Sequence, residues 1–586
     1  MLRKNFASSG FRESAHTECG DFRLTAYKKL CVDNCNFYSC GDDFAACSGT
    51  LIYKENFGED ALRMLYEDSR SMTVTELRKN LIGSYAAAVK NGDEIRIFVD
   101  ETHICKLYYY AEGGKYILTN TFWHIEKCAG QPLHEDAFME RLARPWTTMS
   151  RQTQYQNIYK LCAREYFRIN LSDGACSVEE CPLNDYHRKF SSREDALEYL
   201  FRKAEYISSL RSKCIRSHRI FLTGGLDSRL EYAMHLYNHD DVRPSYWLSR
   251  LESVVTNGTQ KDWEIVRKLA YKGGGGQEPE LFDITEPVRE TLRDDILPMC
   301  KKYGEYAGIY AQNKKWYSIF ENNDTEGITL GYFGETLRTL EELEISYKPP
   351  YSLRDMIRDV YCRYDVDKNC LHSDTLYDYI EQEMKPFTGG MNTGDITRDE
   401  AFRLFTYSRF EADAVIDNLV NMFTYSFMIF AQKEFADANF SIPYEWREGD
   451  YFSISLTKMF CQKLLEVPYY SHHHTVVYDP ATNRVRNTAE YNVKGNLKRR
   501  YANNPLYKAA RAIYRGLKFL KSSDARRERK AEKYARDMIK ISEQILRESP
   551  TIAHTKLKLD DKNRFHFSTI HIAVNYVKIA DALNEE

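Results

Sequence analysis

Residues 220–230 read Ile220-Phe221-Leu222-Thr223-Gly224-Gly225-Leu226-Asp227-Ser228-Arg229-Leu230 and join an apolar run to a turn with two glycines. The apolar run predicts a buried strand, and the residues from Ser228 onward have the spacing of an amphipathic helix. Glycine lets the backbone approach a ligand closely. Loop N–H groups, the Thr223 and Ser228 hydroxyls and the positive end of a helix meet in this turn. The turn is therefore suited to bind phosphate oxygens.

Asp227 indicates that a phosphate bound here would be accompanied by a cation, since a carboxylate alone repels an anion. Magnesium would resolve this, because it prefers carboxylate and phosphate oxygens. A Walker-type loop would end in Gly-Lys-Ser/Thr, which this turn lacks. The plainer alternative is a strand–turn–helix connection in which Asp227 or Ser228 caps the helix. The complete string favours the phosphate site.

Helical and strand patterns alternate around this turn. Helical spacing covers 194–210 and 263–270, and short apolar runs predict strands at 245–248, 281–284 and 328–330. Such alternation is typical of a parallel sheet.

A second glycine-containing loop follows the last of these strands and reads Gly331-Tyr332-Phe333-Gly334-Glu335. Both loops are thus predicted at the carboxyl ends of parallel strands. That is where open α/β sheets bind their ligands.

Three parts of the chain are expected. Residues 1–185 are rich in short β-branched and aromatic runs separated by turns, which predicts an α+β sandwich domain. Residues 190–500 contain both loops and predict an α/β doubly wound parallel-sheet domain that becomes mostly helical. Residues 501–586 include the charged segment 524–533 and predict a solvated helical C-terminal extension.

The composition is that of a soluble globular protein, with 43% hydrophobic and 28% charged residues in 586 and a net charge of −3. Such a balance attracts neither nucleic acid nor a membrane surface strongly. No run of 18 apolar residues predicts a membrane span. An odd number of cysteines, 15, and no apolar leader predict a reduced, cytoplasmic protein. The clustered cysteines lack the spacing of a zinc site: Cys31, Cys35, Cys40 and Cys47.

The string around Asp227 resembles the Ser-Gly-Gly-x-Asp-Ser loop of the PP-loop ATP pyrophosphatases, with Thr223 in place of the first serine. The surrounding pattern is similar to the asparagine synthetase family in particular. The segment 257–262 and the loop 331–335 match further family segments. Upstream, 97–109 resembles a strand pair of the family's glutaminase-like (Ntn-type) domain, with Asp100 at its acidic position.

The resemblance implies an AMP-forming amide ligase. A carboxylate would be activated by ATP as an acyl-adenylate, pyrophosphate would leave, and an amine would displace AMP. The backbone near Leu222 and Gly331 would hold adenine and ribose, with Gly334 on the same loop. The pyrophosphate would lie on Thr223, Gly224, Gly225, Asp227 and Ser228, and Asp227 and Glu335 would bind Mg²⁺. A catalytic lysine is expected in the C-terminal part, where Lys494 and Lys458 are the candidates.

The implied partners are a small-molecule, peptide or glycan carboxylate and an amine, without nucleic acid or membrane. A homodimer stays open. The family's glutaminase uses a cysteine directly after the initiator methionine, whereas this chain has Leu2 there and Cys19-Gly20 further on. We therefore predict that the chain does not hydrolyse glutamine.

The second loop also departs from the family. Tyr332 stands where the family has its first acid, and Thr336 stands where it has its last. Ammonia as the nucleophile is therefore in doubt, and an amine of the substrate itself is the alternative. Two competing functions stay open: another PP-loop enzyme, such as a tRNA-modifying adenylase, and a degenerate nucleotide-binding or scaffold protein.

Overall fold

The computed structural model describes residues 2–144, 148–184, 188–248, 260–274, 276, 278–283, 302–306, 314–362, 373–413, 415–471, 474–479 and 484–487. A few later positions are also described: 540, 544, 547–549 and 577. Lys494, the segment 257–259 and nearly all of 501–586 lie outside the described residues, so the structure does not test the predictions made for them.

The N-terminal elements are α1 Leu2–Ser8, β1 Glu13–Cys19, β2 Phe22–Tyr27, β3 Phe37–Cys40, β4 Asp43–Tyr53, β5 Asn56–Phe57, α2 Glu59–Ser69, α3 Val74–Lys79, β6 Leu81–Asn91, β7 Glu94–Val99, β8 Tyr108–Glu112, β9 Lys115–Thr119, α4 Phe122–Ala129, α5 Glu135–Ala143, β10 Ile158–Lys160, β11 Glu165–Asn170 and β12 Cys176–Glu180.

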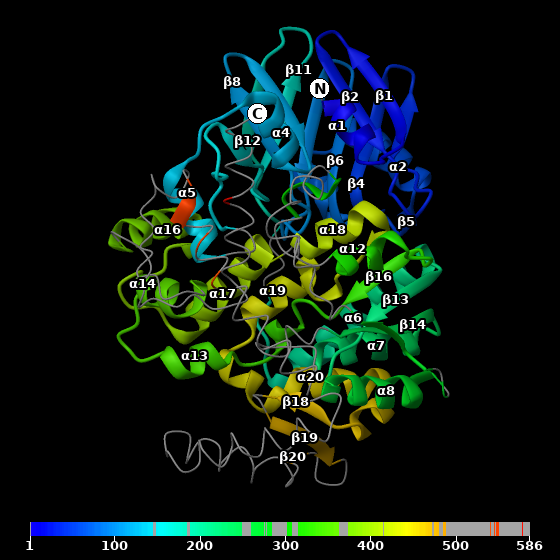
Figure 1. Cartoon of the computed structure of the whole chain (residues 1–586), viewed down its shortest axis with the longest axis vertical. Coiled ribbons are helices and arrows are strands. Elements are labelled where there is room, and N and C mark those ends of the chain that lie inside the picture. The colour runs from blue at the N-terminus through cyan, green and yellow to red at the C-terminus, as the bar shows by residue number, and fades with distance from the viewer. Residues whose placement is uncertain are drawn as a thin grey trace.

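These elements form an antiparallel sandwich at the top of Figure 1. The larger sheet has the order β12-β11-β7-β6-β4-β3, with β5 beside β4, and the smaller sheet has the order β10-β8-β9. Apolar side chains of β7, β8 and β9 meet between the sheets, while α2 and α3 pack on the outer face of the larger sheet. Helix α4 packs on the smaller sheet. The predicted α+β sandwich in this part of the chain is therefore present.

The later elements are α6 Arg193–Cys214, β13 Ser217–Phe221, α7 Asp227–Tyr237, β14 Asp241–Leu248, α8 Gln260–Gly274, β15 Glu280–Asp283, η2 Gly304–Tyr306, α12 Lys314–Glu321, β16 Gly327–Leu330, η3 Gly334–Leu337, α13 Glu341–Ser346, α14 Leu353–Met356, η4 Ile357–Tyr361, α16 Ser373–Thr388, α17 Arg398–Asp413, α18 Val415–Phe423, β17 Tyr425–Ser426, η5 Ile429–Ala431, α19 Lys433–Ser441, η6 Tyr444–Asp450, α20 Tyr451–Cys461, η7 Gln462–Glu466, β18 Tyr469–Ser471, β19 His474–Asp479 and β20 Arg484–Asn487.

Five of these strands form a parallel sheet in the order β15-β14-β13-β16-β17. From β13 the chain adds β14 and β15 on one side and then returns to add β16 and β17 on the other. The order therefore reverses between β13 and β16, and open α/β sheets bind ligands at such a switch point. Helices α6, α7, α8 and α20 pack together along this sheet, as Figure 1 shows.

The helical part joins the sandwich to the parallel sheet. Helices α17 and α19 lie below the sandwich in Figure 1, and a side chain of α18 and one of the segment after it accept hydrogen bonds from the sandwich. The Gly83 N–H donates to Gln432 Oε1 over 2.8 Å, and the Lys106 N–H donates to Asn418 Oδ1 over 2.9 Å. Among the described residues, no helix has both the length and the apolar character of a membrane span.

Candidate functional site

The two glycine loops meet at the switch point. The loop after β13 leads into α7, and the loop after β16 leads into η3. A Cβ added at Gly331 would lie 2.3 Å from the Ser228 backbone nitrogen, and one added at Gly334 would lie 2.6 Å from Asp227 Cβ. Both positions therefore need glycine because the loops touch. The structure thus brings together the two segments that carry the predicted site.

The first loop is held open by its own polar groups. The Thr223 N–H donates to Ser228 Oγ over 2.9 Å, and the two hydroxyls lie 3.0 Å apart. Helix α7 begins at Asp227, with Leu226 at the N-cap and no side-chain cap. The expected cap by Asp227 or Ser228 is therefore wrong, whereas the plain strand–turn–helix connection stays an alternative to a phosphate site. Thr223 is exposed and Gly225 is partly exposed, which leaves this helix end accessible.

Asp227 is the most perturbed group of the loop. Its side chain is 22% exposed, and Oδ2 accepts a hydrogen bond from Arg338 Nη2 over 2.6 Å. Burial raises the pKa of Asp227 to about 6, although Arg338 opposes the shift and Glu335 adds to it. Its other oxygen, Oδ1, is buried and has no hydrogen-bond partner within the described part of the chain. Glu231 Oε2 shares this feature, and such an acceptor marks strain, a catalytic role or an absent ligand.

Glu335 lies beside it in η3. Arg409 of α17 donates to Glu335 Oε1 over 2.6 Å. Burial disfavours the charged form of Glu335, but Arg409, a backbone hydrogen bond and Arg338 together outweigh burial, and the pKa lies below its usual value. Glu335 is therefore ionised at neutral pH.

Arg338 and Arg409 are the residues that the sequence analysis missed. Arg338 stands three positions after Glu335, so a cation next to the second loop could have been noticed. Arg409 lies 74 positions away on α17, and no local pattern connects it with this loop.

The donor set fits a magnesium ion. Two carboxylates, Asp227 and Glu335, lie at the same edge of the sheet, and Asp227 Oδ1 lacks a donor. Oxygen ligands of this kind suit Mg²⁺, which usually completes its shell with water and substrate phosphates.

The other residues singled out in the sequence lie in the sheet, in the core or on the surface. The Leu222 N–H donates to the Ser245 carbonyl oxygen over 2.9 Å, which continues the sheet. Thr336 is buried and accepts a hydrogen bond from Asn439 Nδ2, so its role is structural. Lys458 is exposed on α20, 6.0 Å from the Tyr478 ring. Asp100 is buried and accepts from the N–H groups of Ile104 and Cys105, which fixes the turn after β7.

Two cysteines of the sandwich, Cys47 and Cys105, are not activated. Burial raises the pKa of Cys47 to about 12 and raises the pKa of Cys105 well above its usual value. The thiolate is the nucleophilic form, so these thiols are inert at neutral pH.

A second polar cluster, His218, His235 and Asp240, has ligand atoms within 4.8 Å of one another. His235 Nδ1 lies 2.6 Å from Asp240 Oδ2, but Arg211 Nη2 lies 3.2 Å from the same nitrogen. Burial lowers the pKa of both histidines well below the usual value. The adjacent guanidinium opposes a metal ion, so we interpret the cluster as a core hydrogen-bond network.

No protein-family model and no curated protein matches the chain. Two solved structures are similar over part of it. One is glutamine phosphoribosylpyrophosphate (PRPP) amidotransferase from B. subtilis complexed with ADP and GMP, at 12% identity over 33% of this chain and 44% of that chain, with a TM-score of 0.18. The other is described as the allosteric regulatory enzyme of purine biosynthesis, at 14% identity over 34% and 46%, with a TM-score of 0.19. The matched part spans less than half of either solved chain, and at these scores the likeness assigns no activity to this one.

Proposed function

We propose that the chain is an ATP-dependent, AMP-forming amide ligase of the asparagine synthetase kind. The observation that carries the proposal is the contact of the loops 223–228 and 331–335 at the switch point of a parallel sheet, with Asp227 and Glu335 side by side. The resemblance of the first loop to the PP-loop pyrophosphatases supports the same conclusion.

In the proposed reaction, a carboxylate oxygen of the substrate attacks the α-phosphorus of ATP. The bond from that phosphorus to the oxygen bridging the α- and β-phosphorus atoms breaks, and pyrophosphate leaves. An amine nitrogen then attacks the acyl carbon, loses a proton, and AMP departs with the former carboxylate oxygen. Fixed donors contribute most when they face charge that develops in the transition state.

The residues of the first loop would bind the departing pyrophosphate. The N–H groups at the start of α7, which no side chain caps, and the exposed Thr223 would be the donors to the phosphates. Asp227 and Glu335 would hold Mg²⁺, which when bound neutralises phosphate charge. Arg338 and Arg409 fix both carboxylates and keep them oriented before ATP arrives.

Calorimetric ATP binding with magnesium, followed by pyrophosphate exchange with a panel of carboxylic acids, tests the proposal. We expect the Asp227→Ala variant to lose both signals. The matched control is Asp324→Ala, an exposed aspartate at the other end of the sheet that pairs with Arg243. Equal exchange by wild type and Asp227→Ala would contradict the proposal.

A second function, a nucleotide-binding or scaffold protein without catalysis, is favoured by one feature. Both carboxylates are already paired with arginines, and Tyr332 and Thr336 replace the acids that the family uses. ATP binding without exchange on any acid would favour this alternative. Absence of ATP binding would leave only a scaffold.

A further inference from the structure

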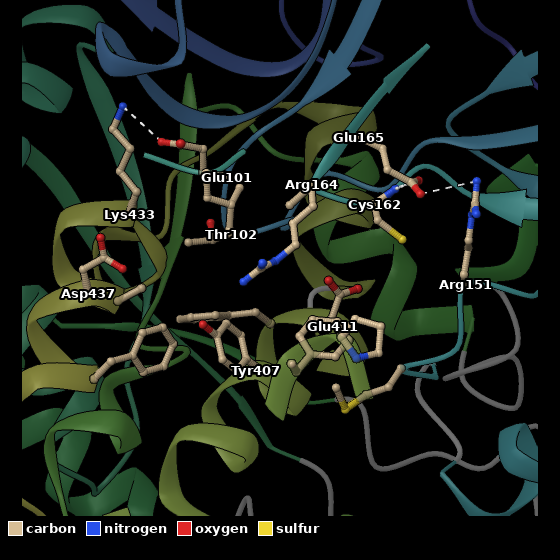
Figure 2. Close-up of a pocket in the computed structure, with 18 of the residues that line it drawn as sticks. Glu101, Thr102, Arg151, Cys162, Arg164, Glu165, Tyr407, Glu411, Lys433 and Asp437 are labelled. Atoms are coloured by element: carbon tan, nitrogen blue, oxygen red, sulfur yellow. Dashed lines mark hydrogen bonds and ion pairs between the residues drawn. The ribbon is translucent and has the colours of Figure 1, made fainter. Parts of the chain in front are cut away.

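A cavity of about 320 Å³ lies between the N-terminal sandwich and the helical part, away from the two glycine loops. Its wall is formed by the turn between β10 and β11, the end of β7, and helices α16, α17 and α19. Figure 2 shows this cavity with its polar side chains. The volume is at the lower end of what small-molecule sites occupy.

One side of the cavity is a ladder of aromatic rings. The centroids of Phe387 and Tyr407 lie 5.4 Å apart, and those of Tyr407 and Phe440 lie 4.6 Å apart. All three side chains are partly exposed, and Phe410 packs in the same wall. An apolar molecule with a flat body would find contact area here.

The acids of the opposite side are largely neutralised. Glu101 lies 3.7 Å from Lys433, and Glu165 lies 3.4 Å from Arg151. Glu411 contacts His103 and lies within 4 Å of two lysines. These groups therefore add little negative potential to the cavity.

Unlike Lys433 and Arg151, Arg164 is not paired with an acid among the described residues. Figure 2 shows its side chain extending into the space between Thr102 and Tyr407. It interacts with the Tyr407 hydroxyl, and within the described residues it forms no ion pair. Two other wall carboxylates, Asp437 and Glu383, do not pair with it, and Glu383 accepts the Arg151 N–H over 2.9 Å.

We propose that this cavity binds a small organic carboxylate. The carboxylate would accept paired hydrogen bonds from the Arg164 guanidinium, which matches a planar carboxylate fork to fork. The apolar body would lie on the ladder of Phe387, Tyr407 and Phe440. This site is separate from the proposed nucleotide site, although α17 touches both through Tyr407 and Arg409.

The test is a ligand-observed NMR titration of the whole chain with benzoate, phenylacetate and 3-phenylpropionate, and with phenylacetamide and phenethylamine as neutral and cationic analogues. We expect at least one carboxylate to bind and its neutral analogue to bind at least tenfold more weakly. Arg164→Gln should weaken the carboxylate at least tenfold. Arg202→Gln, an exposed arginine on α6, is the matched control and should change nothing.

Tyr407→Ala should also weaken binding, because it removes the middle ring of the ladder. Asp227→Ala should leave carboxylate binding intact, which separates this site from the proposed ligase site. No binding of any of the three carboxylates, unchanged binding by Arg164→Gln, or tighter binding of phenethylamine would overturn the proposal. The last result would mean that Asp437 and Glu383 dominate the cavity.

Discussion

Two groups of buried charges in this molecule have opposite character. At the interface below the sandwich, Glu411 lies 2.6 Å from His103 Nδ1, 3.6 Å from Lys106 Nζ and 3.7 Å from Lys160 Nζ. At the switch point, Asp227 and Glu335 each have one arginine at 2.6 Å.

We interpret the Glu411 group as structural and the Asp227–Glu335 group as part of the proposed binding site. Burial opposes the charge of Glu411, yet the hydrogen bond of His103 and the charges of Lys106 and Lys160 keep its pKa well below the usual range. The pKa of Asp227 is instead raised to about 6 by burial, and one of its oxygens has no donor in the described chain. A fully compensated acid holds two parts of a fold together, whereas an acid left short of partners is typical of a binding site.

The largest effect is expected at the compensated group. Glu411→Gln leaves buried Lys106 and Lys160 without a counter-charge, and removing one partner of such a group costs about 3–5 kcal/mol. Chemical unfolding followed by fluorescence would show the loss. The control is Glu198→Gln, an exposed acid paired with Arg202, which should change stability by less than about 0.5 kcal/mol. If Glu411→Gln were as stable as wild type, the Glu411 cluster would not hold the fold together, and its contrast with the Asp227–Glu335 pair would be wrong.

A smaller effect is expected where the loops touch. Gly331→Ala places a methyl group 2.3 Å from the Ser228 nitrogen, so the backbone must move apart. Overpacking of this kind costs about 1–3 kcal/mol. Gly394→Ala is the control, because its nearest atom would be 3.5 Å away. Equal melting temperatures of the two variants would show that the loops separate easily.

The pH dependence should be smaller still. With a pKa of about 6, Asp227 holds a proton at pH 5 that a free aspartate would have released. This proton stabilises the fold below about pH 4, and the stabilisation is lost as pH rises through 6. Magnesium needs the ionised form, so MgATP binding should weaken about tenfold between pH 7 and pH 5. Calorimetry at both values measures this, and equal MgATP affinity at pH 7 and pH 5 would contradict it.

The sequence predicted the local features well, because they arise from neighbouring residues. The strands expected at 281–284 and 328–330 are present within a residue, whereas the strand expected at 245–248 starts four residues earlier, at Asp241. The turn of Gly113 and Gly114 also separates β8 from β9, and both glycines have positive φ. Gly273 and Gly274 end α8, although glycine is unfavourable inside a helix. Strand β17 has only two residues and gives no pattern that could be noticed.

Long-range pairing was beyond the sequence. His103 and Glu411 are 308 positions apart, and Arg338 meets Asp227 across 111 positions. Neither pairing has a periodic signal, because each depends on how separate elements pack. The acids at 227 and 335 could be found from their loops, whereas the arginines that hold them required the structure.

The last prediction is that the protein does not hydrolyse glutamine, so the substitution that tests it should have no effect. The sandwich would need a reactive thiolate to release ammonia, but burial raises the pKa of Cys47, Cys105 and Cys176. Cys19 lines a large cleft beside the hairpin of β1 and β2, and Cys35 and Cys40 are exposed, so these three are the accessible thiols to test among the described residues. We expect purified protein to form no glutamate from glutamine, and Cys19→Ser to be indistinguishable from wild type. Glutamate release that a single cysteine substitution abolishes would show that the sandwich, and not only the switch point, carries chemistry.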